Sequence, residues 1–299
     1  MNELRFFTED DVKRLLGMDD AILRMRAAFD ALRRGQAINQ PRRRMFMQSG
    51  AVLHQMAGAW GRYFGTKIYS THPRHGAHFH FMLYDSEPGR PLALFEANHL
   101  GQIRTGAASG YAADVLAPEH VKTLAVIGSG FQAETQLDAI TRIRRFHSIR
   151  VWSRTPEKRE RLALLHPGAV AAATAGEAVR GADVIVTATS SREPVIESEW
   201  VQPGALIIAM GSNQPNRREL PADLVKRAEY LVADSTEQAR IEAGDFLLAF
   251  DDPDWERVVD LQDAKRPEPG TTTIFKSLGL GVEDVAAAAH VYESATPAQ

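Results

Sequence analysis

Residues 124–133 read LAVIGSGFQA, and residues 148–155 read SIRVWSRT. In the first stretch an apolar run enters a Gly-x-Gly turn at Gly128 and Gly130, and a helical pattern follows. A buried strand that passes through such a turn into a helix presents backbone N–H groups and a helix N-terminus to a pyrophosphate. Ala133 fills the third small position, where close packing of the helix on the strand excludes bulk. We therefore expect a Rossmann-type nucleotide-binding fold.

The second stretch predicts which dinucleotide is bound. Its strand ends without the acidic residue that binds a free ribose 2′-hydroxyl. Ser153, Arg154 and Thr155 stand there instead, with Lys158 and Arg159 close behind. Hydroxyl and guanidinium groups suit a 2′-phosphate, so we expect NADP(H), with NAD possible. The alternative interpretation of Arg154 is a solvated cation at a strand end.

Length and composition narrow the class of protein. The chain has 299 residues, of which 24% are charged, and a formal net charge of −3. This length suggests two domains, and the charge gives no attraction to nucleic acid or anionic membranes. The absence of cysteine excludes disulfides, thiolate catalysis and cysteine metal sites. The start MNELRFFTEDDVKRLL lacks the basic and apolar regions of a secretory signal, and no apolar run is long enough to span a bilayer. We expect a cytoplasmic protein.

From Val121 onward the chain alternates between strand and helix patterns. Strands are expected at residues 123–127, 148–152, 169–173, 183–187, 205–210, 230–233 and 271–275, and helices at 132–143, 156–165, 175–180, 219–228, 235–243 and 254–261. Such alternation is typical of α/β proteins with a doubly wound parallel sheet.

The first part of the chain has a different pattern. Residues 8–34 have helical periodicity. Short strand patterns broken by Gly, Pro and Asp turns occupy residues 43–96, as in an antiparallel sheet. An Ala-rich helix is expected over residues 105–116, where a following proline ends it and marks a domain boundary. We therefore expect a smaller α+β domain before the parallel sheet, and one more helix at residues 282–294.

Cations stand at three unusual positions of the first domain. Arg42–Arg44 enter a strand, Lys67 lies inside an apolar strand, and Arg104 lies at the expected start of the helix over residues 105–116. An arginine at a helix N-terminus is unfavourable, because the helix dipole favours negative charge at that end. Its position is explained if the side chain and the helix end both face an anion. The alternative is three separate surface cations.

Three segments resemble the ornithine cyclodeaminase/mu-crystallin family: GQIRTGAASGYAADVLAP (101–118), IGSGFQA (127–133) and FKSLGLGVEDVAAA (275–288). The order of parts is also similar, with P-x-R, G-x-K and R-T-x-A-x-S (104–109) motifs before the nucleotide turn, and TAT (187–189) and ELPADL (219–224) after it. The resemblance covers nearly the whole chain. Its R-T-x-A-x-S and FKSLG-ED segments are far more specific than the glycines.

The resemblance implies that Arg43, Lys67 and Arg104 hold a substrate carboxylate. Arginine forks bind carboxylates bidentately, so the residue types agree with this role. Because Arg42 and Arg44 flank Arg43, the identity of the carboxylate-binding arginine is open by one position in the sequence. Alternation along the strand puts Arg42 and Arg44 on the face opposite Arg43.

The resemblance also implies the cofactor residues and the domain limits. The positions that match the pyrophosphate site, the adenosine end and the nicotinamide end are Thr105, Gly128, Gly130, Phe131, Gln132, Ser153, Arg154, Thr155, Thr187, Ala188, Thr189, Ser277 and Leu278. A substrate-binding and dimerisation domain is expected from residues 1–117 plus 280–299, because the last helix of the family packs back onto the first domain. Residues 118–279 then form the dinucleotide-binding domain, and a homodimer is expected.

One departure from the family bears on the reaction. Cyclodeaminase members carry a proton-accepting aspartate in a GxDxPGxxEL stretch, whereas residues 211–220 read GSNQPNRREL, with Asn213 at that position. An amide can orient an amine or imine but has no proton to exchange near neutral pH, which disfavours net deamination. The alternative role of Asn213 is that of a turn residue.

Four histidines, His72, His75, His78 and His80, fall close together. A metal site is one interpretation, but no nearby Asp, Glu or Cys completes a ligand pattern, so no metal is expected. A strand that lines the ligand pocket explains the cluster better, with His78 or His80 as a substrate contact or proton donor.

These features together predict an NADPH-dependent reductase that converts a 2-imino or cyclic ketimine carboxylate into an amino acid by hydride transfer. Lys67 is the candidate to polarise the imine or relay a proton, and Asn213 the candidate to orient it. Two alternatives stay open. One is an amino-acid dehydrogenase or cyclodeaminase that releases ammonia, and the other is a non-catalytic NADPH-dependent ligand-binding protein.

Overall fold

The computed structural model describes residues 4–295, and the chain divides into two compact units. Unit 1 comprises Met1–Ala108 and Gly279–Gln299, and unit 2 comprises Ser109–Leu278. The ends of the expected first domain, residues 1–3 and 296–299, lie outside the described residues. Among the described residues, none of the helices combines the length and the apolar character needed to cross a bilayer.

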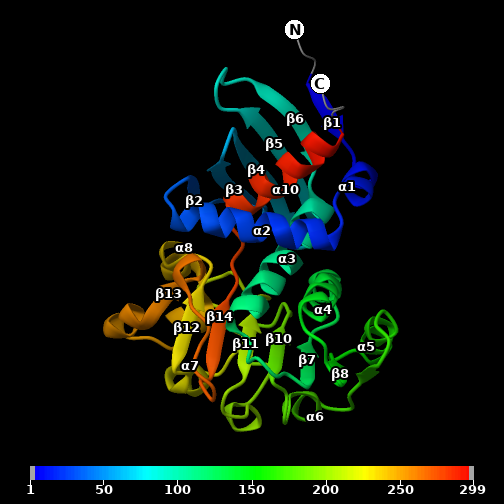
Figure 1. Cartoon of the computed structure of the whole chain (residues 1–299), viewed down its shortest axis with the longest axis vertical. Coiled ribbons are helices and arrows are strands. Elements are labelled where there is room, and N and C mark those ends of the chain that lie inside the picture. The colour runs from blue at the N-terminus through cyan, green and yellow to red at the C-terminus, as the bar shows by residue number, and fades with distance from the viewer. Residues whose placement is uncertain (1–3, 296–299) are drawn as a thin grey trace. The chain divides into compact units, whose positions relative to one another are not determined.

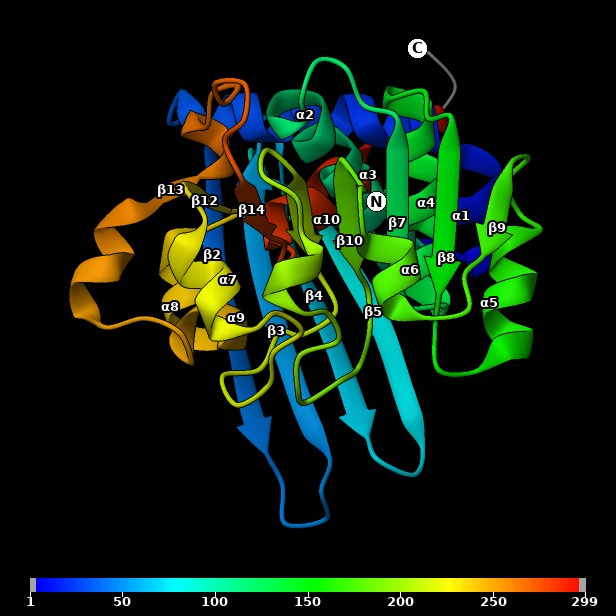
Figure 2. The same cartoon turned by 90° about the horizontal axis from the view of Figure 1, so that it is seen from below.

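Unit 1 is built on a six-stranded sheet in the order β1-β6-β5-β4-β3-β2 (Figure 1). Its strands are β1 (Arg5–Phe7), β2 (Ala37–Phe46), β3 (Val52–Trp60), β4 (Tyr63–His72), β5 (Gly76–Asp85) and β6 (Pro91–Glu96). Strands β2 to β6 pair antiparallel, as predicted, while β1 adds a short parallel strand at one edge. The two long hairpins β2–β3 and β4–β5 lie side by side (Figure 2).

The helices of unit 1 cover one face of this sheet. They are α1 (Glu9–Leu15), α2 (Met18–Arg33), the first part of α3 (Asn98–Leu116) and α10 (Gly281–Ser294), so the expected single helix over residues 8–34 is two helices separated at Gly17. Helix α10 packs on β3, β4 and α2. Helix α10 approaches the sheet so closely that a Cβ atom on Gly58 would collide with the backbone of Val282. The other face of the sheet is not covered by these helices.

Helix α3 begins earlier than its local sequence predicts, and the reason is a distant residue. The N–H groups of Asn98 and His99 both donate to the carboxylate of Glu9, each at 2.7 Å. An acidic side chain at this end suits the helix dipole. Arg104 therefore lies within the helix, and the expectation that it stands at a helix N-terminus is wrong.

Unit 2 is a doubly wound parallel sheet of eight strands in the order β13-β12-β14-β11-β10-β7-β8-β9, which confirms the predicted fold class. Its strands are β7 (Thr123–Ile127), β8 (Ser148–Trp152), β9 (Ala169–Ala171), β10 (Val184–Thr187), β11 (Leu206–Ala209), β12 (Tyr230–Ala233), β13 (Val258–Asp260) and β14 (Thr273–Lys276). Every pair is parallel, so the carboxyl ends of β7, β8, β10, β11 and β14 share one edge.

Helices flank the sheet of unit 2, and the central strands are buried on both faces, as the apolar runs predict. The helices are α4 (Phe131–Ile143), α5 (Pro156–Ala163), α6 (Ala175–Val179), α7 (Ala222–Arg227), α8 (Thr236–Glu242) and α9 (Gly244–Leu247). One prediction fails here. Residues 254–261, expected as a helix, form the end of a 3₁₀ turn (Asp252–Arg257) and strand β13.

The chain passes between the units at two points. It leaves unit 1 within α3, after Ala108, and returns to it after Leu278. The expected boundaries were 117/118 and 279/280. The first boundary lies earlier than expected because α3 is continuous across it. The two parts of this helix pack in different units, although the helix itself ends at Leu116.

Candidate functional site

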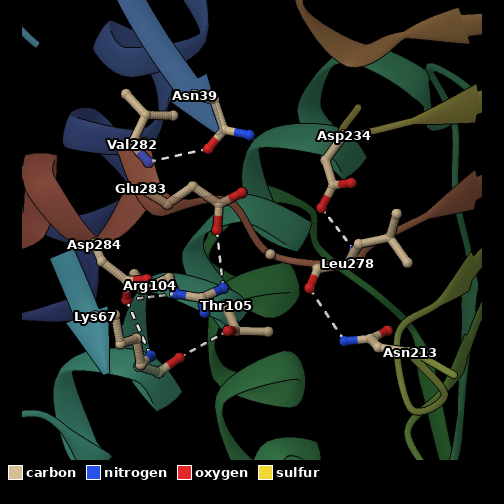
Figure 3. A network of polar contacts seen from close by, with 12 residues as sticks. Asn39, Lys67, Arg104, Thr105, Asn213, Asp234, Leu278, Val282, Glu283 and Asp284 are labelled. Carbon is tan, nitrogen blue, oxygen red and sulfur yellow. Dashed lines mark hydrogen bonds and ion pairs between the residues drawn. The ribbon is translucent and has the colours of Figure 1, made fainter. Parts of the chain in front are cut away.

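Unit 1 holds a buried group of two cations and two carboxylates (Figure 3). Lys67 on β4 places its Nζ 3.1 Å from Oδ1 of Asp284, the fourth residue of α10. Arg104 on α3 places its Nε 3.1 Å from the same oxygen and its Nη1 2.9 Å from Oε2 of Glu283. The four residues are each 6% exposed or less. The structure therefore brings together Lys67 and Arg104, two of the three residues expected to bind a carboxylate.

Two glycines make room for these cations. The ammonium group of Lys67 lies where a Cβ atom of Gly101 would be. The guanidinium group of Arg104 lies where a Cβ atom of Gly279 would be, and the φ of +78° at Gly279 also favours glycine. Sequence reasoning missed both glycines and both carboxylates as site residues. All four lie in the GQIRTG and LGLGVED stretches, so the signal was present.

The electrostatics of this group favour a lysine that exchanges its proton near neutrality. Burial lowers the pKa of Lys67 to about 8, assisted by the charges of Arg104 and Arg42 and opposed by that of Asp284. Burial alone would raise the pKa of Asp284, but the charges of Arg104 and Lys67 outweigh it and hold that pKa below its ordinary value. Asp284 thus remains a carboxylate, while Lys67 can hold or release a proton.

The neighbouring arginine of β2 is Arg42 rather than Arg43. The pairing of β2 with β3 shifts between Gln40 and Arg43, so a β-bulge rotates this part of the strand. Arg42 is 5% exposed, its Nη2 lies 3.5 Å from the carbonyl oxygen of Gly279, and its charge acts on Lys67. Arg43 is exposed on the opposite face. Alternation correctly grouped Arg42 with Arg44, but the face that these two share is the buried one.

A histidine that the sequence analysis did not consider lies on the same face. His54 is buried, its Nε2 is 3.0 Å from Oγ1 of Thr71, and its ring stacks on Tyr69. Burial lowers its pKa to about 4, and the charges of Arg44 and Arg42 add to this effect. His54 is therefore neutral at physiological pH.

The four clustered histidines lie elsewhere. His78 and His80 are exposed, whereas the alternate residues Phe79 and Phe81 face Lys67 or the core, so the expected substrate contact of His78 or His80 is not supported by their placement. The rings of His72 and His75 lie 4.5 Å apart. Across the part of the chain that the structure describes, no three His, Asp or Glu side chains gather as metal ligands would.

Unit 2 presents a nucleotide-binding edge at the turn after β7. Gly128 has a φ of +126°, and a Cβ atom there would collide with the carbonyl group of Ala188. Gly130 caps α4, and open space surrounds the place where its Cβ atom would be. Phe131 is exposed and Gln132 half-buried in the first turn of this helix. A helix N-terminus beside an open glycine turn fits a pyrophosphate group.

The expected adenosine segment follows the adjacent strand β8. Oγ of Ser129, in the glycine turn, donates to Oγ of Ser153 at 2.7 Å, and Ser153 in turn donates to the carbonyl oxygen of Thr155. Nη1 of Arg159 donates to the carbonyl oxygen of Ser153. Arg154 and Thr155 are exposed. The segment therefore has a fixed backbone and an outward-facing guanidinium group.

Three segments lie at the ends of β10, β11 and β14 on the same edge. Thr187–Thr189 and Ser277–Leu278 are the two expected at the nicotinamide, and the loop with Asn213, the other catalytic candidate, follows β11. Nδ2 of Asn213 donates to the carbonyl oxygen of Leu278 at 3.1 Å, which joins two of them (Figure 3). Thr105, expected at the pyrophosphate, belongs to unit 1, where its hydroxyl donates to the carbonyl oxygen of Gly101 at 2.7 Å.

Comparison with known proteins agrees with this geometry. The sequence model of the ornithine cyclodeaminase/mu-crystallin family matches residues 3–299. The chain is 40% identical over 214 residues to the ketimine reductase mu-crystallin of Mus musculus, covering 71% of this chain and 68% of that one.

Two solved structures extend the likeness to almost the whole fold. The Δ¹-pyrroline-2-carboxylate reductase of Thermococcus litoralis, in complex with NADH and L-proline, has a TM-score of 0.92 at 28% identity over 98% of this chain and 97% of that chain. An archaeal alanine dehydrogenase dimer with bound NAD has a TM-score of 0.89 at 29% identity over 98% of this chain and 96% of that chain.

The buried charges of unit 1 give a stability prediction. Asp284→Asn leaves Lys67 and Arg104 buried without their shared carboxylate, so we expect the free energy of unfolding to fall by about 3 kcal/mol. Urea denaturation measures this. The matched control on the same helix is Glu293→Gln, which breaks the more exposed pair with Arg24 and should cost less than about 1 kcal/mol. Equal losses in the two variants would contradict the stabilising role of Asp284.

Proposed function

Because this chain belongs to the ornithine cyclodeaminase/mu-crystallin family, we propose that it reduces the C=N bond of a 2-imino or cyclic ketimine carboxylate to an amine. The observation that carries the proposal is the buried side chain of Lys67. It has a pKa of about 8 and lies beside the positive charge of Arg104. In this proposal Lys67 is the proton donor, and Arg104 beside it is the anion-binding group. The relatives named above support the reaction class, since two of them are imine reductases by name.

A nicotinamide cofactor would supply the hydride, and the carboxyl edge of unit 2 has the residues to hold it. Gly128 and Gly130 leave the backbone open for a pyrophosphate, with the N-terminus of α4 behind them. The segments after β10, β11 and β14 would hold the nicotinamide end. The solved relatives contain NADH or NAD, which supports a nicotinamide cofactor of either kind.

The residues of unit 1 have separate roles in this proposal. Arg104 and Arg42 bind the substrate carboxylate, since guanidinium groups pair with carboxylates in two-pronged geometry. Lys67 supplies the proton that the nitrogen takes up while hydride adds to the carbon, and Asp284 keeps the lysine in place. The neutral His54 and the ring of Tyr69 lie on the same face and extend the site away from Lys67.

Asn213 argues for reduction rather than release of ammonia. Its amide is held by a hydrogen bond to Leu278, and an amide has no titratable proton near neutral pH. Deamination by water needs a group that accepts protons at this step, whereas hydride transfer to an imine does not. We propose that Asn213 takes no part in proton transfer.

We also propose a homodimer built through unit 1. The uncovered face of its sheet exposes apolar side chains, namely Ile38, Met45, Phe64 and Ile68, each exposed by 36% or more. Such a patch is typical of a protein interface. One solved relative is a dimer by name, which supports the same assembly here. Sedimentation velocity of the purified chain measures the oligomeric state.

The central test is turnover with imino acids. Purified protein should oxidise reduced cofactor in the presence of 1-pyrroline-2-carboxylate, 1-piperideine-2-carboxylate, or a 2-oxo acid with an amine. Lys67 is protonated below its pKa of about 8 and loses its proton above it, so kcat/KM for reduction should fall as the pH rises through about 8. Lys67→Met should remove most activity and this dependence.

Two results would count against the reaction. The first is no oxidation with any of these substrates at high enzyme concentration, although cofactor binds. The second is a wild-type pH profile that stays flat through the titration of Lys67, since another group or solvent would then supply the proton.

The two neighbouring arginines give a matched pair of variants. Arg42→Ala should raise KM for the imino acid by about tenfold or more, because it removes a buried guanidinium beside Lys67. Arg43→Ala, on the exposed face, should change KM by less than about twofold. Steady-state kinetics measure both, with cofactor affinity as the control. The reverse order would restore Arg43 as the carboxylate ligand, as the family motif implies.

The finer proposal for the cofactor is a preference for NADPH, supported by Ser153, Arg154 and Thr155 at the end of β8. Arg154→Ala should lower the ratio of kcat/KM for NADPH to that for NADH by about tenfold, since one charge-assisted contact with the 2′-phosphate is lost. Glu157→Gln, in the first turn of α5, is the control and should leave the ratio unchanged. A wild-type enzyme that prefers NADH would contradict the proposal.

A further inference from the structure

A fully buried carboxylate joins two of the segments at the carboxyl edge of unit 2. Oε1 of Glu219 accepts hydrogen bonds from the N–H and the hydroxyl of Thr189, each at 2.7 Å. Oε2 accepts from the hydroxyl of Thr187 at 3.0 Å and from the N–H of Gly211 at 2.7 Å. Each carboxylate oxygen therefore takes one backbone N–H, one from the segment after β10 and one from the segment after β11.

Two further buried charged residues, Asp245 and Lys276, hold Glu219 in place and connect it to the segment after β14. Oδ1 of Asp245 accepts from the N–H groups of Glu219 and Leu220, at 2.6 and 2.9 Å. Nζ of Lys276, the last residue of β14, lies 2.9 Å from Oδ2 of Asp245 and donates to the carbonyl oxygen of Ser212 at 2.6 Å. Glu219, Asp245 and Lys276 are each 0% exposed. Together they connect the ends of β10, β11 and β14.

The packing around this cluster leaves little freedom. A Cβ atom on Gly211 would collide with the backbone of Thr189, so the two segments touch where Glu219 binds them. Burial raises the pKa of Glu219, and the charge of Asp245 adds to this effect, while Lys276 and the bonds from Thr189 oppose it. Two buried carboxylates beside one lysine are costly to keep, and the hydrogen bonds that the carboxylate of Glu219 accepts all come from the ends of β10 and β11.

We propose that Glu219, held by Asp245 and Lys276, is the positioning residue for the nicotinamide end of the cofactor. It fixes Thr187–Thr189, Gly211 and, through Lys276, the start of Ser277–Leu278 in a single arrangement. The inference rests on the nicotinamide cofactor of the proposed function. The bonds of this cluster end at β10, β11 and β14, whereas the adenosine end is expected at β7 and β8. The influence of Glu219 should therefore be confined to one half of the dinucleotide.

Glu219→Gln tests this confinement. A glutamine keeps the shape but has only one oxygen, so one of the two backbone N–H groups must face an NH₂ group. We expect the Kd of the preferred reduced cofactor to rise by about tenfold. The Kd of ADP-ribose, or of its 2′-phosphate for an NADPH-preferring enzyme, should change by less than about twofold. The fluorescence of the bound reduced nicotinamide should also shift toward that of the free cofactor. Calorimetry and fluorescence titration measure these quantities without turnover.

The matched control lies at the opposite edge of the same sheet. Asp183 immediately precedes β10, and its Oδ2 accepts from the N–H groups of Lys122 and Thr123 at the start of β7. Asp183→Asn should leave both dissociation constants, and therefore their ratio, within about twofold of the wild type. If Glu219→Gln does not fold, Asp245→Asn decides instead. It keeps the two bonds to Oδ1 but weakens the link to Lys276, and a smaller change of the same kind is expected, about threefold for the reduced cofactor alone.

Equal losses for the reduced cofactor and for ADP-ribose would overturn the inference, because Glu219 would then only stabilise the fold. An unchanged Kd for both ligands in a folded Glu219→Gln variant would overturn it as well. Neither result affects the proposed reaction. A wild-type protein that binds no nicotinamide dinucleotide would instead end both proposals.

Discussion

The shared carboxylate of Asp284 is the interaction on which unit 1 depends. It bonds to Lys67 from β4 and to Arg104 from α3, while the residue itself belongs to α10. Each of these charges is tolerated in the interior because its partners are there, and none of them would remain buried alone at modest cost. A segment from the end of the chain is thereby fixed against strands from its beginning. The fold of unit 1 and the anion binding proposed for it thus depend on the same atoms.

Unit 2 also buries charged groups, with a different balance of signs. In unit 1 two cations converge on the carboxylates of α10, and burial is the main cause of the lowered pKa of Lys67, while the charge of Asp284 opposes it. In unit 2 a single lysine, Lys276, contacts Asp245, and burial together with the charge of Asp245 raises the pKa of Glu219. The first group suits an anion and a mobile proton. The second is suited to holding backbone segments still, because its oxygens accept N–H groups rather than face outward.

What the sequence predicted well depended on local patterns. The parallel strands of unit 2 and the turn at Gly128 follow from apolar runs and glycines that are close in sequence. What it missed depended on distant partners. The start of α3 is set by Glu9, and the face of β2 that is buried is set by a bulge against β3. The family motif selected Arg43, and simple alternation then put Arg42 and Arg44 on the opposite face. Neither the contact of Glu9 with α3 nor the bulge of β2 is visible within a window of neighbouring residues.

The same distinction explains why the chemistry is harder to predict than the fold. A lysine within an apolar strand identifies Lys67 as unusual, but its proton affinity depends on residues from β2, α3 and α10 together. Asn213 shows the converse. Its amide occupies the place of the family's aspartate, and the backbone bond to Leu278 fixes it whatever the reaction. Since an amide cannot take up a proton, the proton of the proposed reaction is assigned to another group. The buried Lys67, with a pKa of about 8, suits that task, and the proposal therefore favours hydride transfer to an imine over hydrolytic loss of ammonia.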